Sequence, residues 1–125
     1  MKTNSFISLN SFSTSGRIVK DAETFDTKHG KCYRFSIAHN MGKDRDALFT
    51  DIVMFDKNGK QDVAVDESLL KKGTAVVVEG YRRPNNLRKD GKIVKYGTDY
   101  VALTLTSIES YKAELDGSVE TENEE

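Results

Sequence analysis

Apolar residues recur at every second position through most of this chain. In the segment "KCYRFSIAHN", Tyr33, Phe35 and Ile37 alternate with the residues between them. Alternate residues of a β-strand point to opposite faces, so this spacing suits a strand with one buried face, whereas an amphipathic helix repeats about every 3.6 residues. The pattern therefore predicts an all-β fold.

Turn signals divide the alternating pattern into strands. Gly16 predicts a bulge or sharp bend in the first strand, and the polar segment 26–31 predicts a turn before the second. Asp90 and Gly91 predict the turn of a long hairpin between the last two strands. Five strands are expected, within residues 4–23, 31–40, 48–59, 74–83 and 94–110.

A short helix is expected between the third and fourth strands. Residues 61–73, "QDVAVDESLLKKG", carry acids early, basic residues late and a closing glycine, which is the charge order of a short helix. Three strands, a short helix and a hairpin follow one another in an OB-fold, a five-stranded Greek-key barrel that binds oligonucleotides or oligosaccharides. Periodicity alone does not exclude another small barrel.

Charge is unevenly distributed along this chain, whose formal net charge is -1. Residues 113–125 hold six acids and no base, which leaves 19 basic and 14 acidic residues, a charge of +5, in residues 1–112. The acidic segment has no apolar periodicity. We therefore expect an OB-fold domain over residues 1–112 and a short acidic disordered tail over residues 113–125, which serves either solubility or regulation.

The positive charge is concentrated in the predicted hairpin. Residues 81–97 contain six basic side chains and a single acid, Asp90. Cations on both arms of a hairpin could follow the phosphates of a nucleic acid strand, although a solvated arm is the plainer interpretation. The six are Arg82, Arg83, Arg88, Lys89, Lys92 and Lys95.

Several motifs resemble those of bacterial single-stranded DNA-binding proteins, which are OB-fold proteins. They are "SGRIVKDAE", "YRFSIAHN", "FTDIVMFDK", "LLKKGTAVVVEGYRR" and "KYGTDYVALTLTSIES", and they span about residues 6–110 in the family's order. Ala22 stands where the family usually has proline. The resemblance implies a homotetramer, or else a dimer, that binds and protects single-stranded DNA without sequence preference in replication, recombination and repair.

The resemblance also assigns candidate DNA-binding residues. Phe49 and Phe55 match the aromatic positions of the family's third strand, on which bases stack. Six residues apart in a strand, both rings must point to the same face. The alternative is that both belong to the core. Further phosphate contacts are expected from Arg17 and Arg34, on strands taken to lie next to the third, and from Lys57.

Two other aromatic positions of the family are not matched in this sequence. Asn86 and Leu87 lie near the hairpin position, and the loop after the second strand reads "HNMGKDRD". Tyr81 and Tyr96 flank the hairpin, where they either stack bases or pack against the barrel.

Catalytic and metal-binding functions find little support. His29, His39 and the lone Cys32 do not form a spaced zinc-ligand set, and residues 56–67 place glycine at the wrong position for a calcium loop. We expect no catalysis and no cofactor, because no phosphate-binding glycine loop or nucleophile–base pair is present. Without a signal peptide or an apolar run of about 18 residues, a cytoplasmic, nucleoid-associated location is expected.

Two rival functions share the predicted fold. An accessory or adaptor protein, as in a primosome or a mobile element, would act mainly through protein partners and bind DNA weakly. An oligosaccharide-binding OB-fold would show little salt dependence, and the basic hairpin argues against it. The chain ends in "ETENEE", without the hydrophobic tip through which the family's tails recruit proteins. Electrostatic competition between this acidic segment and DNA is the remaining hypothesis for it.

Overall fold

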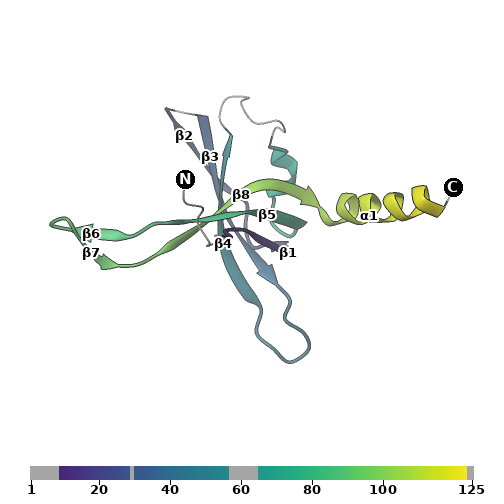
Figure 1. Cartoon of the computed structure of the whole chain (residues 1–125), viewed down its shortest axis with the longest axis horizontal. Helices are drawn as coiled ribbons and strands as arrows, with labels where there is room; N and C mark the ends of the chain where they lie inside the picture. Colours follow the sequence, from purple (N-terminus) through teal and green to yellow (C-terminus); the bar gives the residue numbers. More distant parts are fainter. Residues whose placement is uncertain (1–8, 29, 57–64, 124–125) are drawn as a thin grey trace, which may run out of the picture.

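The computed structural model describes residues 9–28, 30–56 and 65–123. Strands of one sheet follow the order β1-β5-β8-β4-β3-β2, and a two-stranded ribbon, β6-β7, extends from it (Figure 1). The elements are β1 (Phe12–Ile18), β2 (Glu23–Thr27), β3 (Gly30–His39), β4 (Leu48–Asp56), the 3₁₀-helix η1 (Glu67–Leu70), β5 (Ala75–Pro84), β6 (Leu87–Lys89), β7 (Lys92–Lys95), β8 (Thr98–Ser107) and α1 (Ile108–Asn123).

The sheet closes into a barrel because β1 pairs with β3 as well as with β5. Strands β4 and β8 run parallel, and the other neighbours are antiparallel. Five strands, β1, β3, β4, β5 and β8, therefore form the barrel, with η1 between β4 and β5. This confirms the predicted five-stranded OB-fold with its short helix and long hairpin.

Two glycines allow strands to approach closely. A Cβ atom on Gly16 would lie 2.3 Å from the carbonyl oxygen of Ala38, and one on Gly80 would lie 1.9 Å from that of Val101. Next to Gly16, Arg17 of β1 pairs with Ala75 of β5 and also with Ala38 of β3. Gly16 thus lies at the closure point of the barrel, and its pairing with β5 continues without a register shift, so the strand has no bulge at this position.

The core follows the period-two pattern read from the sequence. Inward residues of the adjacent strands β3 and β4 lie next to one another in register, as Phe35 and Ile52 do. The buried cluster comprises Ile18, Tyr33, Phe35, Ile37, Ile52, Met54, Leu70, Val76, Val78 and Ala102. Alternation therefore assigned the buried face of β3 correctly.

The helix η1 covers one end of the barrel. The Asp66 side chain caps the N-terminus of η1 by accepting a hydrogen bond from the Ser68 backbone N–H. The Tyr33 hydroxyl donates a hydrogen bond to Glu67 of η1 at 3.2 Å. Burial, together with the Glu67 carboxylate, raises the pKa of Tyr33 to about 12. The short helix expected within residues 61–73 is confirmed at Glu67–Leu70, and residues 61–64 of that range lie outside the described residues.

Two parts of the fold differ from the sequence-based expectation. Strand β2 was not predicted, because all five of its side chains are exposed and it has no buried face to produce an alternating signal. Helix α1 occupies residues 108–123, where a long last strand and a disordered tail were expected. Ser107 ends β8 and caps α1, since its hydroxyl accepts from the Ser110 backbone at 3.1 Å. Ala, Glu, Lys and Leu then supply helix propensity without an apolar stripe.

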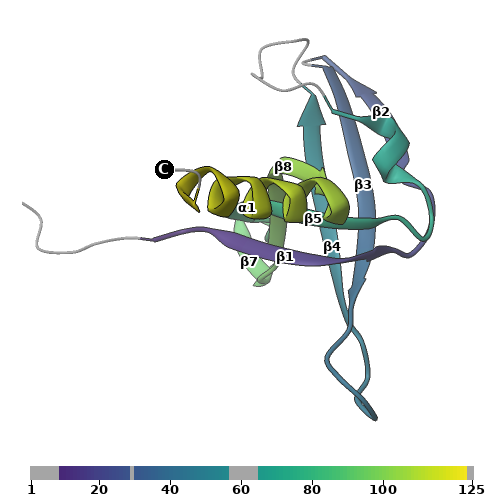
Figure 2. The same ribbon diagram turned by 90° about the vertical axis from the view of Figure 1, so that its right-hand side faces the viewer.

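The projecting elements lie at different sides of the barrel. The hairpin β6-β7 extends on one side and α1 on the opposite side (Figure 1). The β3–β4 loop extends at the end away from β2 and η1 (Figure 2). Among the described residues, no helix is long and apolar enough to cross a membrane.

Candidate nucleic-acid interface

Strand β4 presents one aromatic ring near each of its ends. Phe49 and Phe55 pair in register with Ala38 and Cys32 of β3, so both face outward, opposite to the inward side chain of Ile52. Phe49 is 64% exposed, Phe55 is partly exposed, and neither belongs to the core cluster. The predicted common face is confirmed, and the core alternative is wrong. At about 3.3 Å per residue the two positions are roughly 20 Å apart, which suits separate bases.

The surface between the two rings combines an apolar floor with charged edges. Val53 pairs with Val101 of β8, and both are buried although they face outward from the barrel core. Arg34 is exposed on β3 and pairs with Val53 of β4. It was expected on a neighbour of the third predicted strand, which is β4, and this is confirmed. The Asp51 carboxylate accepts a hydrogen bond from the Ser36 hydroxyl across the same two strands.

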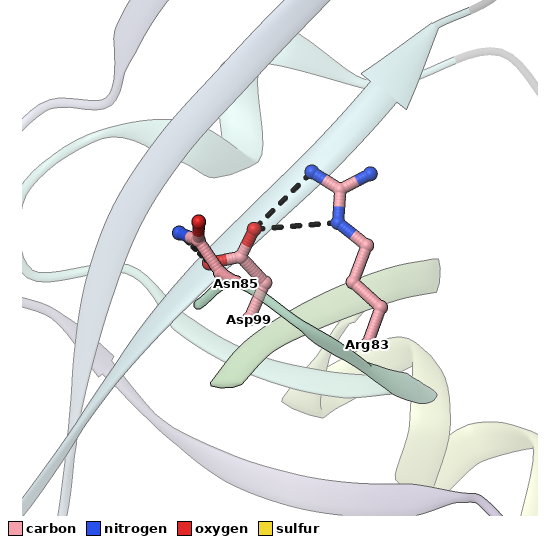
Figure 3. Close-up of polar contacts among 3 residues, drawn as sticks. All are labelled: Arg83, Asn85 and Asp99. Carbon is pink, nitrogen blue, oxygen red and sulfur yellow. Dashed lines mark hydrogen bonds and ion pairs between the residues drawn. The ribbon is translucent and has the colours of Figure 1, made fainter. Parts of the chain in front are cut away.

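A polar cluster lies beside the Phe55 ring. The Arg83 guanidinium donates from Nε and Nη2 to Oδ2 of Asp99 at 3.3 and 3.2 Å, and the Asn85 amide donates to Oδ1 at 3.0 Å (Figure 3). The central carbon of this guanidinium lies 4.9 Å from the centroid of the Phe55 ring, a cation–π contact. Arg83 therefore belongs to the barrel face as well as to the start of the hairpin.

The remaining hairpin cations are exposed. Asp90 and Gly91 have positive φ angles of 53° and 79° and form the predicted tight turn between β6 and β7. Within the described part of the chain, ion pairs join Lys20 with Glu23, Lys31 with Glu67, and Arg83 with Asp99. Five predicted contacts thus carry charge without an ion pair to the described residues; they are Arg82, Arg88, Lys89, Lys92 and Lys95.

An aromatic residue stands at the base of the hairpin. Tyr96 is 78% exposed and shares a shallow groove with Leu87, which is also exposed. Of the two alternatives for Tyr96, packing against the barrel is therefore excluded. Tyr81 is half-buried on β5, in register with Val101.

One of the predicted contacts, Arg17, lies on a strand that does not pair with β4. Arg17 belongs to β1, which pairs with β3 and β5 rather than with β4, and its Nη1 donates to the Gly73 carbonyl at 2.9 Å. Arg17 was expected on a strand next to the third predicted strand, which is β4. This expectation is wrong, because β3 lies between β1 and β4 in the closed barrel. Lys57 lies outside the described residues.

Two residues of this surface were not predicted from the sequence. Phe25 of β2 is exposed and pairs with Cys32, whose other neighbour in register is Phe55, so its ring extends the apolar surface across three strands. Asp99 holds the Arg83 cluster from β8. An acid in an alternating strand is too common to attract attention, and β2 carried no strand signal.

A closed OB barrel with outward aromatic rings on β4 and a basic hairpin defines a class, the OB-fold domains that bind single-stranded nucleic acids. The model of the Single-strand binding protein family matches residues 9–108. The chain belongs to this family.

Solved structures share the fold of this chain, whereas no curated protein matches it. The chain is similar to a single-stranded DNA-binding protein of Plasmodium falciparum in complex with single-stranded DNA, with 23% identity, a TM-score of 0.60 and coverage of 84% of this chain and 99% of that chain. It is also similar to the mitochondrial single-stranded DNA-binding protein of S. cerevisiae, with 16% identity, a TM-score of 0.58 and coverage of 82% and 96%. At these identities the likeness establishes the shared fold.

Proposed function

We propose that this protein binds and protects single-stranded DNA without sequence preference by stacking bases on β4 and following phosphates with the hairpin. The observation that carries this proposal is the placement of Phe49 and Phe55 on one outward face of β4. Exposed aromatic rings on a barrel wall contribute nothing to the core, and every base has a π-face that can stack on them.

Stacking supplies the part of the affinity that does not depend on salt. Each stacked base contributes about 1–3 kcal/mol, and the contribution is similar for all four bases. Duplex DNA should bind poorly, because its bases are already stacked on one another. The candidate stacking residues are Phe49, Phe55 and Tyr96.

Phosphate neutralisation supplies the salt-dependent part. Cations on both arms of the hairpin can accompany a strand that leaves the barrel face, and Arg34 adds a charge beside Val53. On single strands the logarithm of the affinity should fall with the logarithm of the salt concentration by about 0.7 per contacted phosphate. Arg17 and Lys57 complete the set of proposed contacts.

The family supports a wider role for the protein. We propose action in replication, recombination and repair, as a member of the bacterial branch to which the sequence motifs are similar. Self-association into a homotetramer, or else a dimer, is part of this proposal. The proposed role needs no cofactor and no catalytic step. We further propose that the protein is located with DNA in the cytoplasm.

Fluorescence anisotropy of a labelled oligothymidine, measured across a salt series with a duplex competitor, tests the proposed function. Strand-selective binding that weakens steeply with salt is expected. Weak binding, or equal binding of duplex, would overturn the proposal and favour an adaptor that acts through proteins. Binding of an oligosaccharide with little salt dependence would favour the second rival.

A further inference from the structure

Asp99 is a nearly buried carboxylate on a surface proposed to bind a polyanion. Its side chain is only 12% exposed. Both of its oxygens accept hydrogen bonds, Oδ2 from Arg83 and Oδ1 from Asn85 (Figure 3). A negative charge at this place opposes the approach of phosphates, so its presence calls for a compensating benefit.

Asp99 fixes the position of the Arg83 side chain, which can compensate for this opposing charge. The guanidinium is fixed over the Phe55 ring, with its central carbon 4.9 Å from the ring centroid. The Arg83 side chain is 41% exposed, and its Nη1 donates to none of the described residues. A planar guanidinium offers a stacking surface for a base, and its remaining donors can reach a phosphate.

We propose that Asp99 is a positioning residue for DNA binding, which fixes Arg83 over Phe55 so that ring and guanidinium present one preorganised surface to a base and its phosphate. This inference rests on the proposed function and assigns to that function a residue that does not itself touch DNA. Fixing Arg83 before binding removes the entropy cost of ordering a long side chain at the moment of binding.

The energetics favour a pair that stays intact when DNA binds. If Arg83 left Asp99 for a phosphate, a nearly buried carboxylate would keep Asn85 as its partner but lose its counter-charge. Removing the counter-charge of a nearly buried carboxylate is costly, because the carboxylate stays poorly solvated. Nη1 can donate to a phosphate while Nε and Nη2 remain on Asp99, so binding does not require the pair to break.

Asp99→Asn separates this role from plain electrostatics by the sign of its effect. Removing a negative charge from a DNA-binding surface should tighten binding at low salt and leave it unchanged at the limit of about 1 M salt if charge alone matters. If Asp99 positions Arg83, the same change releases the guanidinium and weakens binding. Asp51→Asn is the matched control, because it removes an equal charge from the same face, and Asp51 accepts from Ser36 rather than from Arg83.

The experiment measures anisotropy of labelled oligothymidine with the full chain across a salt series, extrapolated to 1 M salt. We expect Asp99→Asn to bind about three- to tenfold more weakly at that limit, the size of one cation–π or stacking contact, with its salt slope unchanged. Asp51→Asn should bind as tightly as the unmodified chain or more tightly. Arg83→Lys keeps the charge but loses the planar fork, and it should weaken binding by a similar factor.

Thermal unfolding of each variant checks that the barrel is intact, and Arg83→Lys, at a half-exposed side chain, provides the test if Asp99→Asn does not fold. Asp99→Asn binding as tightly as the unmodified chain would overturn the inference, as would Arg83→Lys binding normally or Asp51→Asn losing as much affinity as Asp99→Asn. In each of these cases the proposed function stands. Only a failure of the unmodified chain to bind oligothymidine would overturn both.

Discussion

The barrel face and the hairpin hold their positive charges in opposite ways. On the face, Arg83 is fixed by Asp99 and by the Phe55 ring. On the hairpin, four exposed cations, Arg88, Lys89, Lys92 and Lys95, form no ion pair with the described residues. A fixed cation can contribute direction and stacking, whereas free cations contribute mainly charge. The two regions should therefore be separable by salt, because stacking survives high ionic strength and phosphate neutralisation does not.

Removing the rings of the face should have the largest effect. Phe49→Ala combined with Phe55→Ala removes two stacking positions, each worth about 1–3 kcal/mol, so affinity for oligothymidine should fall by about one and a half to four orders of magnitude. Fluorescence anisotropy across a salt series measures this loss of affinity, and the salt slope should stay the same. Phe49→Tyr with Phe55→Tyr keeps both rings and serves as the control. Normal binding by the double alanine variant would mean that the DNA-binding surface does not include the rings of β4.

Neutralising the hairpin should produce the complementary result. Changing Arg88, Lys89, Lys92 and Lys95 to Gln should reduce the salt slope by about 3, at about 0.7 per phosphate, and weaken binding by about three orders of magnitude in 0.1 M salt. Extrapolated to 1 M salt, the affinity should equal that of the unmodified chain. Replacing the same four residues by the other basic residue, Arg for Lys and Lys for Arg, is the control. An unchanged slope would mean that the hairpin is a solvated arm.

Tyr96 sharpens the comparison, because it is a stacking candidate located on the hairpin. Its ring is 78% exposed, and Tyr96→Ala should weaken binding about five- to tenfold, the lower part of the range for one stacked base. The loss should be the same at every salt concentration, as for the rings of β4 and unlike the neighbouring cations. Tyr96→Phe should bind normally in the same titration, and a loss in that variant would point to the hydroxyl instead of the ring.

The fold could be predicted further than the site. Alternation around Tyr33, Phe35 and Ile37 identified a buried face because burial is what maintains that pattern. The Arg83–Asp99 pair depended on register instead. Counting from the Asp90-Gly91 turn places Arg83 opposite Thr98, but a bulge between Leu87 and Arg88 shifts the pairing by one residue, to Asp99.

A shift of one residue exchanges the two faces of a strand, so the partner of Arg83 could not be found by counting. Nothing in the local residues marks the bulge. Strand β2 was missed for a different reason, because it is held by pairing with β3 rather than by burial of its own side chains. Phe25 was missed with it. Long-range pairing decided each of these features.

The smallest effect is expected from the acidic end of the chain. Helix α1 extends on the side of the barrel opposite to the hairpin (Figure 1), so its acids oppose DNA only at long range. Deleting residues 113–125 should tighten oligothymidine binding about two- to threefold in 0.01 M salt, where the Debye length is about 30 Å, and have no effect in 0.15 M salt, where it is about 8 Å. Changing the acids of this segment to their amides keeps the helix while removing its charge, so it should reproduce the deletion. If deletion tightened binding and the amide variant did not, the segment would act by occupying space near the DNA, and its charge would be incidental.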